Sequence, residues 1–216
     1  MSGERRGIFS IKPLTLIIAV ALVAGVGWWS WGNDEKPALP SASDKIGVNS
    51  LPVPQFIYRD QDGKAFGMKE LKGKVWLADM IFTRCPDICS PMTANMSRLQ
   101  KKLRESGMKD VQLVSFSVDP LHDTSPVLKR YGKNLRADFK NWTFLTHDSE
   151  AQMERFLKMA FGSPIVRKES RSSDEPLVIN HPARFYLMDK EGKIMAKYNA
   201  MQPDYQRIVE DVRSIQ

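Results

Sequence analysis

The stretch KVWLADMIFTRCPDICSPMTANMSRLQKKLRES, residues 74–106, joins a buried-strand pattern, a cysteine pair and a helix pattern without interruption. Residues 74–82 are almost continuously apolar, which is typical of a strand covered on both faces. Beyond the cysteines, apolar side chains recur at helical spacing and predict an amphipathic helix with an inner stripe of Met92, Met96, Leu99 and Leu103. A second apolar run, residues 111–118, follows, so this region predicts a parallel βαβ unit.

The remaining patterns extend this unit on both sides. Residues 56–66 predict a β-hairpin with an Asp-Gly turn, and residues 184–200 predict a second hairpin that turns at residues 189–192. Helices are expected at residues 125–136, 149–161 and 203–215, with a short strand at residues 142–146 between the first two. This order predicts an α/β, thioredoxin-like fold with an N-terminal β-hairpin extension, spanning residues 52–216.

The N-terminal region has the pattern of a membrane anchor. Residues 14–31 form an 18-residue stretch without a charge, and a helix of that length is about 27 Å long, close to the roughly 30 Å hydrocarbon thickness of a bilayer. Arg5, Arg6 and Lys12 precede it, which favours a cytoplasmic segment at residues 1–13 and export of the remainder. The bulky Trp28, Trp29 and Trp31 argue against the alternative of a cleaved signal peptide. Residues 32–51, rich in Pro, Ser and charge, read as a linker.

Length and charge restrict the function further. A chain of 216 residues can build a core that needs no disulfide, so its two cysteines call for a chemical explanation. The formal net charge is +7, and +5 remains after residues 1–32 are removed, from 29 Lys and Arg against 24 Asp and Glu. This excess is dispersed along the domain, which favours acidic partners or anionic surfaces over nucleic acid.

The two cysteines, Cys85 and Cys89, stand four positions apart in the segment that leads into the predicted helix. An exported thiol pair at this spacing can form a structural disulfide, a redox pair or part of a metal site. We expect Ser90 to be the N-cap and Pro91 the first helical residue. Cys89 then lies at the positive end of the helix dipole, which stabilises the thiolate that binds metals and exchanges disulfides.

A metal site would need a further ligand. Two thiolates suit Cu(I), which accepts two or three such ligands, whereas structural zinc takes four. His181 is the leading candidate, because the strand after it runs beside the first central strand in this fold. His122 and His147 are weaker candidates, and the methionines of the helix stripe are expected to pack in the core.

Three motifs in order resemble the Sco/SenC family of membrane-tethered copper proteins: CPDIC at 85–89, SFSVDPLHDTSPVLKRYG at 115–132 and NHPARFYLMDKEGK at 180–193. The resemblance implies one copper ion, Cu(I) or Cu(II), held by Cys85, Cys89 and His181. It also implies a role in assembling the dinuclear copper site of cytochrome c oxidase. The implied partners are the copper-accepting oxidase subunit and a thiol reductant or copper donor. Pro182 stands where thioredoxin folds often have a cis-proline.

Several other residues are expected to support the site. Asp79 resembles the buried acid beneath the cysteines of thioredoxins, where it would tune their proton affinity or serve as a hydrogen-bond anchor. Asp119 and Asp123 match the family's acidic loop, where they would fix the turn or support partner docking and copper. The polar connection at residues 163–178 is expected to move and let His181 reach the metal.

The sequence therefore predicts a metallochaperone, not primarily an enzyme, attached to a bacterial cell membrane by a single pass with its domain on the extracytoplasmic side. The alternative is a thiol-disulfide oxidoreductase that reduces the acceptor's cysteines, with Cys85 and Cys89 as a catalytic redox pair. His181 separates these hypotheses, because the first requires it and the second does not. A copper or redox sensor is a third class, and it would need docking surfaces that the sequence does not identify.

Overall fold

The computed structural model of the chain describes residues 44–45, 51–85, 89–168 and 178–216. All of them belong to one compact unit, residues 41–216. The predicted anchor at residues 14–31 and the segment before it lie outside the described residues. In the described part, no helix is long and apolar enough to cross a membrane.

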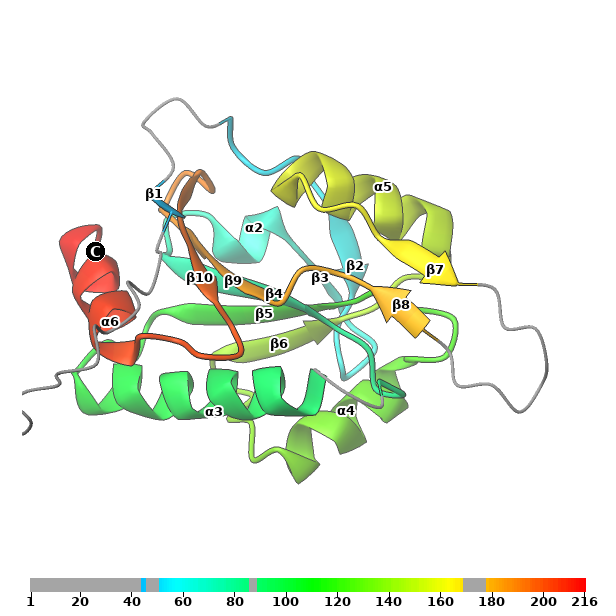
Figure 1. Ribbon diagram of the computed structural model, residues 1–216, viewed down its shortest axis with the longest axis horizontal. Helices are drawn as coiled ribbons and strands as arrows, with labels where there is room; N and C mark the ends of the chain where they lie inside the picture. The colour runs from blue at the N-terminus through cyan, green and yellow to red at the C-terminus, as the bar shows by residue number, and fades with distance from the viewer. Residues whose placement is uncertain (1–43, 46–50, 86–88, 169–177) are drawn as a thin grey trace, which may run out of the picture. The chain divides into compact units, whose positions relative to one another are not determined.

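A six-stranded mixed sheet forms the centre of the described unit (Figure 1). In spatial order its strands are β1 (Asp44–Lys45), β10 (Ile194–Asn199), β9 (Arg184–Met188), β4 (Trp76–Ile81), β5 (Gln112–Ser117) and β6 (Trp142–Leu145). β4, β5 and β6 run parallel, while β9 lies antiparallel beside β4 and is continued by β10. The predicted α/β arrangement, its βαβ unit and its C-terminal hairpin are thus confirmed.

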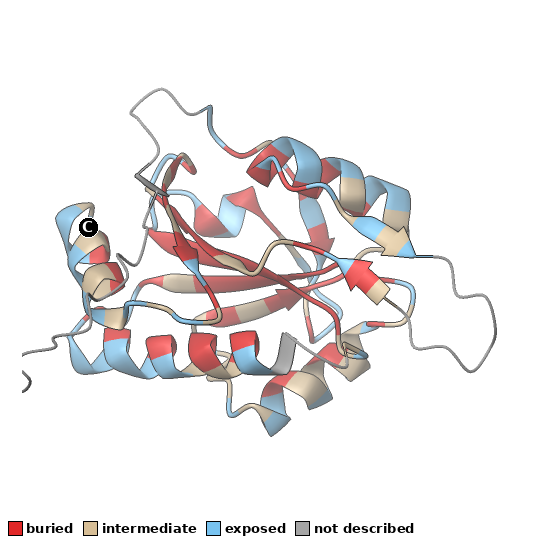
Figure 2. Ribbon diagram, in the orientation of Figure 1, coloured by how far each residue is buried: buried red, intermediate tan, exposed pale blue. Residues whose placement is uncertain are grey.

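Helices cover both faces of this sheet, because its central strands carry apolar side chains on both sides. All six residues of β4 are buried. Met80 and Phe116 belong to a cluster that includes residues of α2 (Met68–Leu71) and α5 (Glu150–Phe161). Leu77 and Ile81 belong to the opposite cluster, with residues of α3 (Cys89–Glu105), α4 (Ser125–Asn134) and α6 (Tyr205–Ser214). Figure 2 shows the buried residues concentrated on the sheet and on the inner side of α3.

The helix after the cysteines confirms the predicted stripe, since Met92, Met96, Leu99 and Leu103 are fully buried. Its predicted start is wrong by two residues: α3 begins at Cys89 rather than at Pro91. The proline is accommodated as the third helical residue because N–H groups in the first turn have no acceptor within the helix. Cys89 is therefore itself the first residue of α3.

Two small hairpins accompany the main sheet. The predicted N-terminal hairpin is confirmed as β2 (Ile57–Arg59) paired with β3 (Ala65–Gly67), joined by a turn at Gly63 whose φ is 77°. A second pair, β7 (Val166–Lys168) and β8 (Val178–Asn180), was not predicted. These two strands lie at the two ends of the polar connection predicted at residues 163–178. The expected movement of this connection remains a prediction, because residues 169–177 lie outside the described part.

Two short elements also differ from the predicted pattern. Asp44–Lys45, within the predicted linker, pair with β10 as β1. The four-residue helix α2 follows β3 directly, and Glu70 accepts a hydrogen bond from the Gly67 N–H at 2.8 Å. Neither element has enough residues to produce a recognisable hydrophobic period.

Candidate metal centre

The parallel arrangement of β4 and β5 brings the segments that follow them to one edge of the sheet. β4 continues into Phe82, Thr83, Arg84 and Cys85, and the Val118 N–H donates to the Ile81 carbonyl at 2.8 Å. The Cys85 N–H donates to the Phe82 carbonyl at 3.3 Å, which forms a turn directly after the strand. The Cys85 side chain is half-buried and packs against the cluster of apolar residues that contains Phe82.

The second cysteine is described only through its backbone. As the first residue of a 17-residue helix, Cys89 occupies the predicted position at the positive end of the helix dipole. Its side chain and residues 86–88 lie outside the described part of the structure. The pairing of Cys85 with Cys89 therefore remains a prediction from their spacing.

His181 comes to the same edge from the C-terminal part of the chain. It directly follows β8, is only 8% exposed, and lies with its ring edge-on to that of Phe82, with 6.0 Å between the ring centroids. Phe82 is three residues before Cys85. The fold therefore places His181 against a residue that is close to Cys85 in the chain, although the two predicted ligands are distant in sequence.

The environment of His181 favours an uncharged imidazole. Burial lowers its pKa below the usual value, opposed in part by a contact of Nδ1 with the Pro182 carbonyl at 3.4 Å. Because a carbonyl can only accept, this contact favours the tautomer that carries the proton on Nδ1, in which Nε2 is the ring nitrogen with the lone pair. The described residues contain no cis peptide bond, so the bond between His181 and Pro182 is trans.

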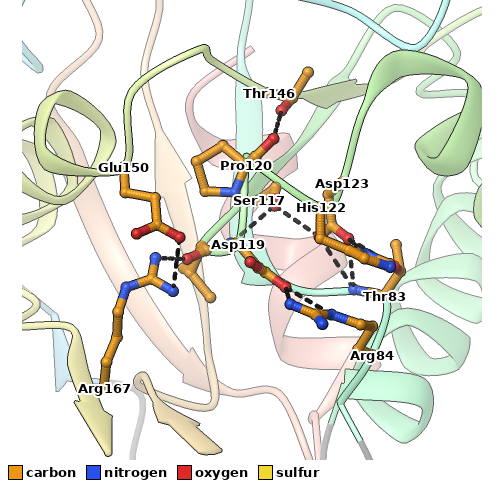
Figure 3. Close-up of polar contacts among 11 residues, drawn as sticks. Thr83, Arg84, Ser117, Asp119, Pro120, His122, Asp123, Thr146, Glu150 and Arg167 are labelled. Atoms are coloured by element: carbon orange, nitrogen blue, oxygen red, sulfur yellow. Dashed lines mark hydrogen bonds and ion pairs between the residues drawn. The ribbon is translucent and has the colours of Figure 1, made fainter. Parts of the chain in front are cut away.

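Asp123 connects the cysteine loop to the segment after β5 (Figure 3). Its carboxylate is fully buried and accepts hydrogen bonds from the Thr83 hydroxyl at 2.6 Å, the Thr83 N–H at 3.1 Å and the Ser117 hydroxyl at 2.7 Å. Thr83 is two residues before Cys85. Asp123 thus fixes the segment between β4 and Cys85. The sequence predicts for it only a role in its own turn or in support of docking and copper.

Asp119 makes a second connection between the same two segments. Its Oδ2 accepts from the Arg84 guanidinium at 2.8 and 3.1 Å, and its own N–H donates to the Ser117 hydroxyl. The Asp119 carboxylate is almost completely buried, while Arg84 is about half exposed. The pair ties the residue directly before Cys85 to the segment that follows β5.

His122 adds its ring to the two aspartates, and the three side chains offer ligand atoms within 4.8 Å of one another. Both carboxylate oxygens of Asp123 and Oδ2 of Asp119 nevertheless already accept hydrogen bonds from protein donors. His122 Nδ1 itself lies 3.1 Å from Asp123 Oδ1. This cluster is therefore an anchor for the loop. The third histidine, His147, accepts from the Ser149 N–H and packs edge-on against Tyr58.

Asp79 lies in the middle of β4 and is 1% exposed. Among the described residues, neither of its carboxyl oxygens has a hydrogen-bond partner, and burial raises the pKa of Asp79 to about 7. The Ser115 hydroxyl, opposite it on β5, acts against this rise without reaching hydrogen-bond geometry. Strand alternation puts Asp79 on the face that α3 covers, together with Leu77 and Ile81.

Two arginines near the site were missed in the sequence. Arg84 directly precedes Cys85, and this position in the sequence could have identified it as a residue of the site. Arg167 of β7 has no such signal. It pairs with Glu150 of α5, as Figure 3 shows, and also with Glu154, and it donates to the Val118 carbonyl. Only the path of the chain after α5 brings these groups together.

The mixed α/β sheet, with Cys85 and the buried imidazole of His181 near one of its ends, has the architecture of a thioredoxin-like protein. The model of the SCO1/SenC family matches residues 48–216. The SCO1 protein homolog of Bacillus subtilis is 40% identical over 163 residues, which cover 75% of this chain and 81% of that protein. The chain therefore belongs to the SCO1/SenC family.

Solved structures agree with this assignment. BsSco, in which a disulfide switch was identified and which is a member of the Sco family of cytochrome c oxidase assembly proteins, is 38% identical with a TM-score of 0.68. The match covers 79% of this chain and 96% of BsSco. ScoI of Bradyrhizobium japonicum with copper bound has a TM-score of 0.65 and 24% identity, over 77% of this chain and all of that one. At this identity the likeness to ScoI supports the fold alone.

Proposed function

We propose that this chain is a copper metallochaperone that binds one copper ion through Cys85, Cys89 and His181 and delivers it to the copper-accepting subunit of cytochrome c oxidase. The observation that carries the proposal is the buried, uncharged imidazole of His181 against Phe82, beside the loop of Cys85. Thiolate and neutral imidazole are the forms in which these side chains bind metals.

The donor set matches the chemistry of a copper carrier. Two thiolates and one imidazole suit copper, as Cu(I) or Cu(II), and are one ligand short of a closed structural zinc site. A thiolate of the acceptor can then replace one donor ligand at a time, so that copper passes by ligand exchange. The membership of BsSco among cytochrome c oxidase assembly proteins supports the same assignment.

Copper titration of the reduced chain under anaerobic conditions tests the proposal. We expect tight binding of one copper, and strong weakening by Cys85→Ser, Cys89→Ser and His181→Ala. His147→Ala is the matched control, because that histidine contacts Tyr58 and Ser149, and it should bind copper as the wild type does. Copper binding that is indifferent to any one of the three substitutions would contradict the proposal.

The second candidate function is thiol-disulfide exchange, in which Cys85 and Cys89 cycle through a disulfide and reduce the acceptor's cysteines. The disulfide switch of BsSco favours it. A reduction assay with an oxidised acceptor peptide separates the two functions. Exchange should be abolished by Cys85→Ser but unchanged in His181→Ala, whereas copper delivery should fail in both.

The proposed location is the extracytoplasmic side of a bacterial cell membrane, with residues 14–31 as the single-pass anchor. Its support is the uncharged 18-residue run and the preceding Arg5, Arg6 and Lys12. In a bacterial host, the chain should resist extraction from membranes by carbonate, and deletion of residues 1–31 should release it. Release of the whole chain by carbonate would contradict this topology.

A further inference from the structure

Arg167, in the middle of β7, contacts three groups through its guanidinium, and Figure 3 shows its pair with Glu150. Its Nε donates to Glu154 Oε1 at 2.8 Å, its Nη1 lies 3.2 Å from Glu150 Oε1, and its Nη2 donates to the Val118 carbonyl. The side chain is only 23% exposed, so these interactions are partly shielded from water. A guanidinium fixed by two carboxylates and a carbonyl is a rigid tie between three elements.

The hairpin that Arg167 holds is the one that leads to His181. Arg167 is opposite Ile179 in the pairing of β7 with β8, and β8 ends one residue before His181. In the described residues, β7 and β8 pair with each other and not with the six-stranded sheet. Because an isolated two-stranded hairpin is only marginally stable, its position depends on contacts outside the ladder.

The described contacts of this hairpin with the rest of the domain are few. Ile179 is buried in the apolar cluster on that face, and the ring of His181 packs against Phe82. Arg167 supplies polar contacts, to the first turns of α5 and to the end of β5. Val118 directly precedes Asp119, whose ion pair with Arg84 lies beside Cys85. The end of β5 is therefore connected to the His181 hairpin through Arg167 and to the segment of Cys85 through Asp119 and Arg84.

We propose that Arg167 is a positioning residue, which fixes the β7–β8 hairpin on the end of β5 and thereby sets the place of His181 for copper. This inference rests on the proposed function. It assigns no metal contact to Arg167, which acts through the hairpin. Removing the guanidinium should leave the cysteines and the core intact and weaken only the contribution of His181.

A double-mutant cycle with the whole chain tests the inference. In the presence of His181, Arg167→Gln should weaken copper binding roughly 10- to 100-fold, as loss of a group that orients a ligand typically does. In the His181→Ala background, Arg167→Gln should have no further effect. Lys168→Gln removes the same charge from the next, exposed residue of β7 and is the matched control. Equal weakening in both backgrounds, or none in either, would overturn the inference.

Hydrogen exchange of the metal-free chain provides a readout independent of copper. The amides of β8 should exchange at least several-fold faster in Arg167→Gln, and at the wild-type rate in Lys168→Gln. Unchanged exchange in Arg167→Gln would overturn the inference even if the proposed function holds. If instead His181→Ala alone binds copper normally, the proposed function fails while the exchange result still decides whether Arg167 holds the hairpin. Glu154→Gln is the milder second variant and should act in the same direction.

Discussion

Asp79 places a buried carboxyl group among the apolar side chains of the central strand β4. It is buried in β4 with no hydrogen-bond partner in the described part of the chain, and burial raises its pKa to about 7, near neutral pH. A carboxyl group in such surroundings is costly to ionise. It faces the layer of α3, the helix that begins with Cys89. This position is compatible with a role in tuning the cysteines.

The raised pKa of Asp79 predicts a pH-dependent stability. The pKa of a solvated aspartate is near 3.8, and that of Asp79 in the folded chain is about 7. At pH values between these two, the folded state keeps the proton and the unfolded state has lost it. The free energy of unfolding therefore falls as the pH rises through this window and then levels off. Asp79→Asn removes this term, so between pH 5 and pH 8 the stability of the variant relative to wild type should rise by roughly 3 kcal/mol. Denaturant unfolding of both proteins at these two pH values measures the change, and a difference that is the same at both would contradict the pKa shift.

Asp79 should also affect the thiols. Above pH 7 its carboxylate would disfavour a nearby thiolate, so Asp79→Asn should lower the pKa of at least one cysteine. Titration of the thiolate absorbance in the reduced, metal-free variant measures this shift. If both thiol pKa values stay as in the wild type, Asp79 has no part in tuning them.

At the scale of the elements, Asp123 holds together the segments that follow β4 and β5. Asp123→Ala would leave the Thr83 N–H and the Ser117 hydroxyl without their acceptor. We expect the free energy of unfolding to fall by roughly 2–4 kcal/mol, since each buried donor left unsatisfied costs about 1–3 kcal/mol. Denaturant unfolding measures this change.

Asp148→Ala is the matched control for Asp123. Asp148 pairs with Arg59 at 2.5 Å, but both side chains are largely exposed. Loss of an exposed ion pair should change the stability by no more than about 1 kcal/mol. Similar losses in the two variants would contradict the anchoring role of Asp123.

At the same scale, elements with a local pattern could be predicted from the sequence. The apolar run of β4 and the stripe of Met92, Met96, Leu99 and Leu103 identify a strand and a helix by themselves. β7 could not be predicted, because its three residues include Arg167 and Lys168 and show no hydrophobic period. Its partner strand begins only after residues 169–177, so the pairing is not local.

At the scale of the whole molecule, the sequence could indicate which residues form the candidate site but not how they are held. Cys85 and His181 were recognisable from residue type, from their position relative to predicted strands and from the family resemblance. The ion pairs of Arg84 with Asp119 and of Arg167 with Glu150 and Glu154 depend on tertiary packing. No periodic pattern encodes such contacts, so only the folded chain reveals them.

X-ray absorption at the copper edge tests the central claim most directly, because it counts the atoms bound to the metal. For the whole chain loaded with one copper ion, the proposal predicts two sulfur ligands and one imidazole nitrogen. The nitrogen should disappear in His181→Ala, and one sulfur should disappear in Cys85→Ser, while His147→Ala should leave the spectrum unchanged. A spectrum of His181→Ala identical to that of the wild type would contradict the three-ligand site and leave the cysteines as a redox pair.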